Sequence, residues 1–295
     1  MNKICQKSLC IGLGSIFWFG MAIARDTLPT DSMPNVVICF DDGYQSVYHY
    51  AYPMLKKYKM TATLALVTSK VVPEAHRGTI SGGLRYGFLS KAEIQEMIDS
   101  LGIEIASHSV SHCSLTAVTD SMIRKYELVA SKQVLESLFG QKVITLVYPY
   151  GKYDDQVIRL AAEAGYRIGR TCEFGEPNFW VAPFKVPIKE IRNSTSIKEI
   201  IDHIRRFDLT ILVFHRILPN PHVFTEFSVT RFDSLLAALR LQKFQVSTIR
   251  GMYDDWRQKV IENLVLESGL FDRNYWQKYL FQKVDIDLTG TSPRF

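Results

Sequence analysis

Short apolar runs alternate with amphipathic stretches along most of the chain. Residues 35–40 and 209–214 are nearly continuous apolar runs of strand length, as expected for strands that are buried on both faces. Segments with helical periodicity lie between the runs, and one of them begins at a capping box at Ser90 and ends at Gly102. The other predicted strands cover residues 62–67, 103–107, 143–148, 166–170, 185–191 and 245–248. The other predicted helices cover residues 45–58, 120–139, 154–165 and 196–206, and a last one begins at 230.

Strands that alternate with helices over most of the chain indicate parallel βαβ units. Seven or eight such units predict an α/β protein with a barrel of the (β/α) type, complete or incomplete. A doubly wound open sheet is the alternative. In a barrel of this kind the reactive side chains lie where strands end and loops begin.

The amino-terminal segment has the pattern of an export signal. Two lysines precede an uncharged apolar run, residues 9–24, which ends in the small-x-small sequence Ala22-Ile23-Ala24. We therefore expect a signal peptide at residues 1–24, a linker at residues 25–34, and a protein exported to the periplasm or secreted. The alternative is an uncleaved segment that anchors the protein. After cleavage we expect no stable membrane span, because no second run approaches that length.

Composition and charge add little to this interpretation. The chain has 295 residues, 47% of them hydrophobic and 22% charged, which is ordinary for a globular protein. A net charge of +5 is too small to suggest nucleic acid as a partner. Three of the five cysteines lie beyond the predicted signal peptide, at spacings that match no zinc knuckle and suggest no disulfide framework. The oligomeric state is left open.

Polar residues follow four of the predicted strands. They are Asp41-Asp42-Gly43, His108-Ser-Val-Ser-His112, Tyr148-Pro149-Tyr150-Gly151 and His215. Each alone is as well explained by a turn or a structural histidine, but their shared position at strand ends favours one site. Two histidines and a carboxylate form a three-ligand set for zinc that leaves a position for water. A second carboxylate can act as a base and a further histidine as an acid, which suits hydrolysis of an ester or amide.

These motifs, in this order across residues 35–250, resemble those of the polysaccharide deacetylases, carbohydrate esterase family 4. The resemblance implies a distorted (β/α) barrel with about seven parallel strands. It also implies metal-dependent removal of N-acetyl, sometimes O-acetyl, groups from amino-sugar polysaccharides, with release of acetate. Residues 35–250 would form the catalytic domain, and residues 251–295 would form a helical extension.

The resemblance also implies a role for each motif residue. Asp41 would be the general base and His215 the general acid. The backbone N–H of Tyr150 would help to hold the oxyanion. Asp42, His108 and His112 would bind a divalent metal, usually zinc. Tyr148, Pro149 and Trp180 are the candidates for contact with the substrate.

Two departures from the family pattern affect these expectations. Many members carry an arginine that braces the base two residues before the proline of the third motif, where this chain has Val147. The Asp-x-x-Asp-Trp motif that supports this arginine is also absent. We hypothesise that Arg170, at the end of the fifth strand, replaces the brace, with a solvated arginine as the alternative. Two further functions stay open: an amidase for a small or lipid-linked N-acyl compound, and a carbohydrate-binding protein without activity. The polymer and the metal are not specified by the sequence.

Overall fold

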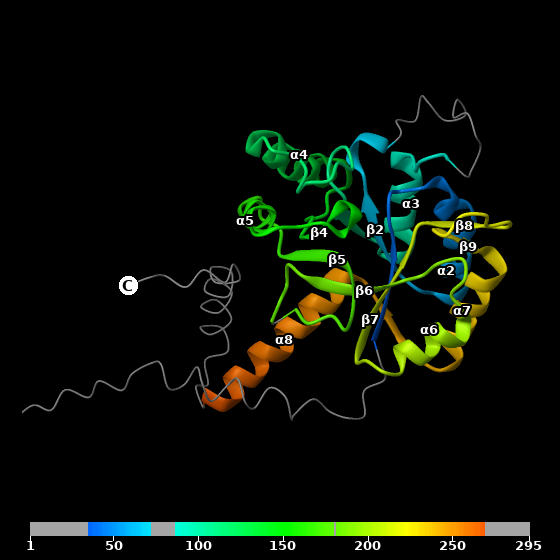
Figure 1. The fold of residues 1–295 in the computed structure, drawn as a ribbon. Helices are drawn as coiled ribbons and strands as arrows, with labels where there is room; N and C mark the ends of the chain where they lie inside the picture. The colour runs from blue at the N-terminus through cyan, green and yellow to red at the C-terminus, as the bar shows by residue number, and fades with distance from the viewer. Residues whose placement is uncertain (1–34, 72–85, 180, 269–295) are drawn as a thin grey trace, which may run out of the picture. The chain divides into compact units, whose positions relative to one another are not determined.

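Seven parallel strands close into a barrel in the computed structural model, which describes residues 35–71, 86–179 and 181–268 (Figure 1). The strands are β1 (Asn35–Phe40), β2 (Thr63–Leu66), β3 (Glu104–Ser107), β4 (Thr145–Val147), β5 (Ile168–Phe174), β6 (Val186–Glu190) and β7 (Leu209–Phe214). Closure comes from β1 and β7, which pair in parallel from Asn35 opposite Leu209 to Phe40 opposite Phe214. The predicted barrel of about seven parallel strands is confirmed, and the open-sheet alternative is excluded.

An eighth parallel strand, β10 (Gln245–Ser247), joins the barrel at its amino-terminal end. It pairs with the first half of β1, from Asn35 to Val37, whereas β2 pairs with the second half, at Cys39 and Phe40. Along this edge of β1, β10 therefore pairs with the first half of the strand and β2 with the second half. This division is one way in which the barrel departs from regular geometry.

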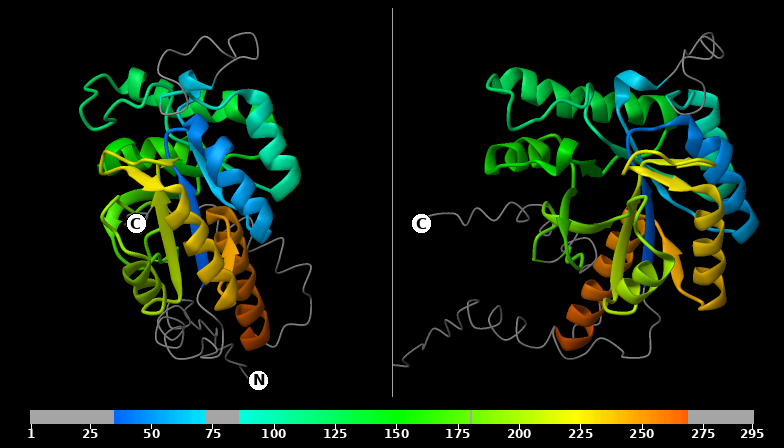
Figure 2. Two further views of the ribbon diagram at one scale, coloured as in Figure 1. Left: turned by 90° about the vertical axis from the view of Figure 1, so that its right-hand side faces the viewer. Right: turned by 45° about the vertical axis from the view of Figure 1, so that its right-hand side comes forward.

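Helices surround the strands, as the three ribbon views show (Figures 1 and 2). They are α2 (Tyr52–Tyr58), α3 (Lys91–Leu101), α4 (Ser121–Phe139), α5 (Asp155–Glu163), α6 (Ile197–Ile204), α7 (Val229–Leu241) and α8 (Ile249–Ser268). Short turns are η1 (Val47–Ala51), η2 (Thr68–Lys70) and η5 (Pro149–Gly151). None of the helices in the described part of the chain is long and apolar enough to cross a membrane.

The capping signals explain where several helices begin and end. Ser90 and Glu93 form a complete capping box at α3, and Ser196 and Glu199 form another at α6. Asp120 caps α4 by accepting hydrogen bonds from two backbone N–H groups of its first turn. The helix expected over residues 45–58 differs from the prediction, because it begins with a π-helical turn, η1, before α2.

Two short strands after β7 were not predicted. β8 (Arg216–Leu218) pairs with β9 (Glu226–Ser228) in a separate two-stranded sheet. Each strand has three residues, which is too short to show a period. The last helix, α8, begins at Ile249 and so runs across the expected domain boundary at residue 250. The predicted signal peptide (residues 1–24), the linker (residues 25–34) and most of the extension (residues 269–295) lie outside the described residues.

Candidate metal and catalytic site

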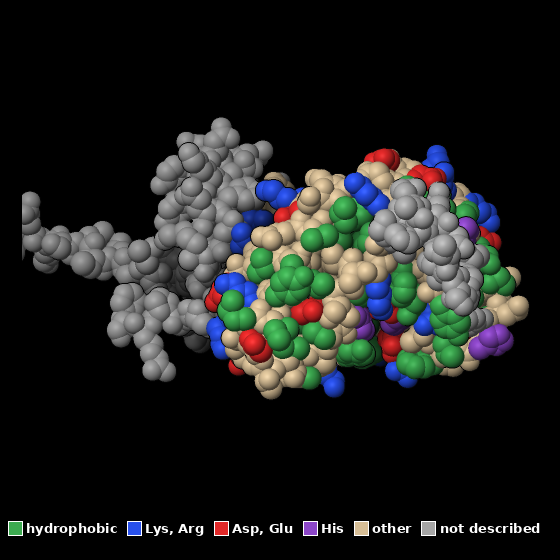
Figure 3. All heavy atoms as spheres, turned by 90° about the horizontal axis from the view of Figure 1, so that it is seen from above, with side chains coloured by type: hydrophobic (Ala, Val, Ile, Leu, Met, Phe, Trp, Pro, Cys, Tyr) green, Lys and Arg blue, Asp and Glu red, His purple; other side chains and the backbone are tan. Residues whose placement is uncertain are grey.

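Four chemically reactive side chains continue the rows of residues that face the barrel interior. Along β1, Val37 and Cys39 belong to the inner core cluster, and Asp41 is next in the alternation. Three other strand ends repeat this arrangement, with His108 after Ala106, Arg170 after Ile168 and His215 after Val213. The period of two along parallel strands therefore brings four reactive side chains to one end of the barrel. Figure 3, seen from above, shows histidine side chains at this surface beside acidic and basic ones.

Asp42, His108 and His112 converge on one point. The Nε2 atoms of the two histidines are 3.1 Å apart, and Oδ1 of Asp42 lies 3.3 Å from His112 Nε2 and 3.6 Å from His108 Nε2. Zinc with bonds of about 2.0–2.1 Å in a tetrahedral set separates its ligand atoms by about 3.3–3.4 Å. The donor set and its spacing therefore fit a divalent ion such as zinc, bound with a further position left open.

The environment of His108 prepares its Nε2 as a metal ligand. Its Nδ1 lies 2.7 Å from the carbonyl oxygen of Val147, so the ring donates there and its Nε2 keeps the lone pair. Burial lowers the pKa of His108 to about 4, although Asp41 and Asp42 oppose this effect. Burial also lowers the pKa of His112. Both rings are therefore neutral near pH 7, as metal binding requires.

Asp41 and Arg170 form a buried ion pair inside the barrel. Nη2 of Arg170 lies 2.5 Å from both carboxylate oxygens of Asp41, and the arginine is fully buried. Burial is the largest single influence on the pKa of Asp41 and raises it. The charges of Arg170, His108 and His215, together with the hydrogen bond from Arg170, outweigh burial, and the pKa falls to about 2. Asp41 is therefore ionised at neutral pH. Val147, where the family pattern has an arginine, is a buried apolar residue that packs with Ala65 and Ala106.

His215 directly follows β7. It lies close enough to Asp41 for its charge to help lower the pKa of that carboxyl group. Its Nδ1 atom is buried and has no hydrogen-bond partner among the described residues. The next residue, Arg216, is fixed by Glu226, at 3.0 Å, and by the hydroxyl of Tyr44, at 3.1 Å. Glu226 is fully buried, so this ion pair holds the chain after His215 in place. Sequence reasoning missed Arg216 and Glu226, because their pairing depends on the unpredicted strands β8 and β9.

The third motif presents one exposed aromatic ring. Tyr150 is 62% exposed, and its ring lies edge-on to that of His112 with centroids 4.7 Å apart. Tyr148 is fully buried, and its hydroxyl donates to the carbonyl oxygen of Phe184. Pro149 is also buried. The side chains of Tyr148 and Pro149 therefore belong to the core and present no surface to a substrate, contrary to what a binding role for them requires. Trp180 lies outside the described residues.

Several residues of the site have a strained backbone conformation. Asp42, Ser109, His112 and Tyr150 have φ values of 71°, 65°, 64° and 59°, in the left-handed region that non-glycine residues rarely adopt. Such residues persist where surrounding contacts determine them, and they are frequent at functional sites. The sequence carries no signal for this property, since none of these positions is a glycine.

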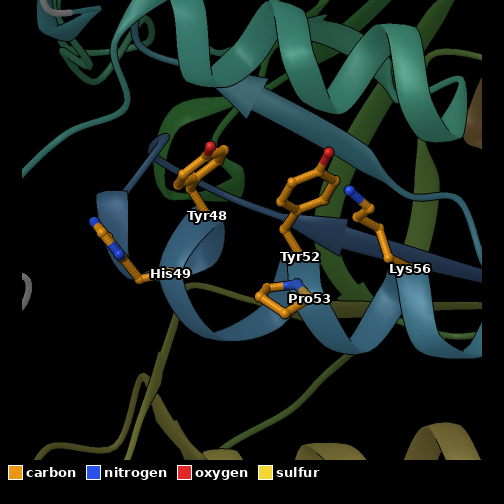
Figure 4. Close-up of a pocket in the computed structure, with 5 residues that line it drawn as sticks. All are labelled: Tyr48, His49, Tyr52, Pro53 and Lys56. Atoms are coloured by element: carbon orange, nitrogen blue, oxygen red, sulfur yellow. The ribbon is translucent and has the colours of Figure 1, made fainter.

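A separate cavity of about 380 Å³ lies on the surface of η1 and α2, lined by Tyr48, His49, Tyr52, Pro53 and Lys56 (Figure 4). The rings of Tyr48 and Tyr52 stack on each other at 5.3 Å, and Lys56 lies over the Tyr52 ring. Both hydroxyls bond to Glu96 of α3. Because these faces and hydroxyls are engaged within the protein, we interpret the rings as a structural connection between helices.

Part of the chain matches a known family of proteins. Residues 29–169 match the model of the polysaccharide deacetylases. These residues, just under half of the chain, are similar to the polysaccharide deacetylases. The family resemblance of the sequence is thereby confirmed.

Two curated relatives of the chain are bacterial proteins. YxkH of Bacillus subtilis, provisionally named a polysaccharide deacetylase, is 31% identical over 155 residues, 52% of this chain and 50% of that protein. The poly-β-1,6-N-acetyl-D-glucosamine N-deacetylase of Staphylococcus aureus (strain MRSA252) is 30% identical over 146 residues, 47% of this chain and 48% of that protein. The chain thus spans about half the length of these relatives.

Solved structures support the fold. The Streptococcus pyogenes deacetylase PplD, in complex with acetate, superposes with a TM-score of 0.52 at 24% identity, over 66% of this chain and 78% of that chain. The peptidoglycan deacetylase PdaC of Bacillus subtilis gives 0.53 at 18% identity, over 80% of this chain and 98% of that chain. At these identities the likeness establishes the barrel and nothing finer.

Proposed function

We propose that this protein is an exported, metal-dependent deacetylase that hydrolyses N-acetyl groups of an amino-sugar polysaccharide of the cell envelope or an exopolysaccharide. The observation that carries the proposal is the convergence of Asp42, His108 and His112 at 3.1–3.6 Å. It lies at the same end of the barrel as the Asp41–Arg170 pair. The similarity of residues 29–169 to the polysaccharide deacetylases supports the reaction class.

Asp42, His108 and His112 would hold the ion, and zinc is the metal that their chemistry favours. When bound, such an ion polarises an acyl oxygen and makes water more acidic. Asp41 would accept the proton of the attacking water, and Arg170 would keep this carboxylate ionised and oriented. Attack at the acyl carbon and loss of the C–N bond give acetate and an amine. His215 would protonate that amine as it leaves, and the N–H of Tyr150 would stabilise the oxyanion.

The substrate part of the proposal rests on the relatives and on one exposed ring. The Staphylococcus aureus relative is named for poly-β-1,6-N-acetyl-D-glucosamine, and we propose a β-linked N-acetylglucosamine polymer for this chain as well. The exposed ring of Tyr150 beside His112 supports stacking of a sugar next to the reacting acetyl group. Trp180 is retained as a second candidate contact. Export to the periplasm or medium, with cleavage after Ala24, is the location consistent with such a polymer.

Two alternative functions are separated from this one by the same assay. An amidase for a small or lipid-linked N-acyl compound would share the site but prefer short substrates. A carbohydrate-binding protein without activity was suggested by the missing arginine at Val147. The contact of Arg170 with both oxygens of Asp41 weakens that suggestion.

The decisive experiment measures acetate release by the purified full chain after chelation and titration with zinc or cobalt. The substrates are poly-β-1,6-N-acetylglucosamine, chitin oligomers, peptidoglycan and N-acetylglucosamine. We expect release from a polymer that depends on the metal. The Asp41→Asn variant should lose about 10²- to 10⁴-fold in kcat while it still binds zinc. A metal-loaded protein inert on every substrate contradicts the proposal, and preference for the monosaccharide favours the amidase.

A further inference from the structure

A buried carboxylate of α4, Glu127, holds the loop between the two histidines of the metal set. Its Oε2 atom accepts hydrogen bonds from the backbone N–H groups of Val110 and Ser111, both at 2.9 Å. Its Oε1 atom accepts from the hydroxyl of Ser111 at 2.8 Å. Three donors of the loop therefore meet one side chain that is only 6% exposed. Successive backbone N–H groups that converge on one anion form a recurring arrangement that fixes a loop.

The loop needs this support because its backbone is strained at both ends. Ser109 and His112 both have left-handed φ values, of 65° and 64°. Such backbone is unfavourable for residues other than glycine and persists only where contacts determine it. The turn between them contains Val110 and Ser111, the two residues whose N–H groups Glu127 binds. The carboxylate thus acts on the segment that sets the direction of His112.

A second residue on the same face of α4 supports the start of the loop. Ser131 lies four residues after Glu127, and its hydroxyl is 2.8 Å from that of Ser107 and 2.6 Å from that of Thr68. The hydroxyl of Ser107 in turn accepts from the N–H of Ser109 at 3.3 Å. Helix α4 therefore holds the loop at two points. His108 is fixed separately, by its bond to the carbonyl oxygen of Val147.

We propose that Glu127 is a positioning residue for metal binding, which sets the place of His112 relative to His108 and Asp42 through the loop. This inference rests on the proposed metal-dependent function. Glu127 touches neither the ion nor the substrate. Because His108 has its own anchor, the loss of Glu127 displaces chiefly His112. Its removal therefore weakens metal binding and leaves the Asp41–Arg170 pair intact.

The test measures the zinc dissociation constant of the full chain by competition with a chelator, and the visible absorption spectrum of the cobalt form. Residues that orient metal ligands typically contribute 10- to 100-fold in affinity. We expect Glu127→Ala to weaken zinc binding by that factor and to alter the cobalt spectrum. Glu127→Gln, which can still accept from both N–H groups, should stay within a few-fold of the wild type.

Glu136 provides a matched control on the same helix. Its carboxylate also accepts from a backbone N–H, that of Val143 at 2.9 Å, and from Lys132 at 2.7 Å, but it has no bond to the histidine loop. Glu136→Ala should lower the melting temperature of the metal-free protein and leave the zinc dissociation constant unchanged. Equal zinc affinity in Glu127→Ala and Glu136→Ala overturns the inference.

A shorter side chain covers the case in which Glu127→Ala does not fold. Glu127→Asp keeps the charge but withdraws the carboxylate from the loop, so its zinc affinity must also fall, and wild-type affinity in a folded Glu127→Asp protein overturns the inference. The proposed function can fail independently of the role of Glu127. If the wild type binds no zinc, the proposed function is contradicted. If the wild type binds zinc and Glu127→Ala binds it equally tightly, only the role of Glu127 is contradicted.

Discussion

Burial and neighbouring charges act in opposite directions on the carboxylate of Asp41, and Arg170 is the strongest of these charges. Burial favours the protonated form, whereas Arg170, at 2.5 Å, favours the ionised form and, together with His108 and His215, lowers the pKa to about 2. A folded-state pKa below the unfolded value means that this pair stabilises the protein above about pH 4 and is lost as pH falls toward 2. Asp41, the proposed base, is therefore ionised at neutral pH.

Replacement of Arg170 should change the pH profile as well as the rate. In Arg170→Ala, only the charges of His108 and His215 still oppose burial, so we expect the pKa of Asp41 to rise above its ordinary value. We expect kcat/KM to fall at least about 10²-fold near pH 7 and a new acidic limb to appear in its pH profile. Zinc affinity should change little. The measurement is acetate release against pH.

Two variants control for the expected loss of stability. A buried carboxylate without its partner destabilises a protein by about 3–5 kcal/mol. Arg170→Lys keeps the charge and should recover part of the rate. The exposed Arg159→Ala should have no effect. Wild-type turnover and an unchanged pH profile in folded Arg170→Ala would show that the arginine is not a brace.

His203, in the last turn of α6, is a second residue whose burial has a consequence for pH. Its ring packs against Phe174 and Phe207, with centroids 5.1 and 4.9 Å away. Burial, followed by the charges of Lys189 and Arg206, lowers its pKa to about 4. As pH falls from about 6.5 to 4, the unfolded chain takes up a proton that the folded chain does not. The stability of the protein therefore declines through this window.

His203→Leu should reduce this decline, because an apolar side chain has no proton to take up. The measurement is the melting temperature of the metal-free protein between pH 4 and 7. We expect a shallower slope for His203→Leu than for the wild type. The slope should not vanish, since the pKa of His108 is also about 4. The exposed His49→Leu is the control, and an identical slope in His203→Leu and the wild type contradicts the prediction.

At the residue scale, the sequence predicted which side chains could meet but not how they are held. Asp41, His108, Arg170 and His215 were found because strand ends and a period of two are visible in a sequence. The carboxylate of Glu127 was missed, because a glutamate within an amphipathic helix has no pattern that separates a solvated residue from one bonded to a distant loop. The same is true of left-handed backbone at residues other than glycine.

At the element scale, helix and strand order could be predicted because continuous apolar runs and capping boxes are local signals. The elements that were missed depend on partners distant in the chain or on detail within a turn. β8 and β9 have three residues each and exist through their pairing with each other. The π-helical turn of η1 has i→i+5 instead of i→i+4 hydrogen bonds, and the apolar pattern does not report this difference.

The first turn of α8 is attached to the barrel by a buried carboxylate, Glu104. It accepts hydrogen bonds from the hydroxyls of Thr63 and Thr145, at 2.9 and 2.7 Å, and from the backbone N–H of Arg250 at 2.9 Å. Glu104 begins β3, whereas His108 follows the end of that strand. The anchor of α8 and the proposed metal set therefore lie at opposite ends of the barrel strands.

Glu104→Ala should lower the stability of the protein and leave its zinc affinity nearly unchanged. The substitution leaves three donors without their acceptor, and each buried unpaired group costs about 1–3 kcal/mol. We expect a loss of at least about 3 kcal/mol in the free energy of unfolding, measured by urea denaturation. Zinc affinity of the folded variant should stay within about twofold of the wild type.

The control for Glu104 is a residue of α8 at the surface. Asp254 pairs with Arg250 across one helical turn at 3.5 Å, and both side chains are substantially exposed. Asp254→Ala should therefore cost less than about 1 kcal/mol. Equal loss of unfolding free energy in Glu104→Ala and Asp254→Ala would show that the buried hydrogen bonds of Glu104 contribute no more than an exposed ion pair.

At the scale of the whole molecule, the proposed metal set lies at one end of the barrel strands and the Glu104 anchor of α8 at the other. This separation predicts how metal binding and folding are linked. A ligand that binds only the folded state adds about 4 kcal/mol of stability at 1,000 times its dissociation constant. For a domain of this size, 1 kcal/mol corresponds to roughly 2–4 °C in melting temperature. Zinc at that concentration should therefore raise the melting temperature of the wild type by roughly 8–16 °C.

The rise in melting temperature caused by zinc should depend on the three proposed ligands and not on the overall stability of the protein. Glu104→Ala should melt at a lower temperature than the wild type but gain a similar increment from zinc, because its three ligand side chains are unchanged. Asp42→Asn should lose most of the increment, since an amide is a poorer zinc ligand than a carboxylate. An equal increment in Asp42→Asn would place the bound zinc elsewhere on the protein. Loss of the increment in Glu104→Ala would show that the anchor of α8 influences the ligand loops through the barrel strands, so that the two ends do not act independently.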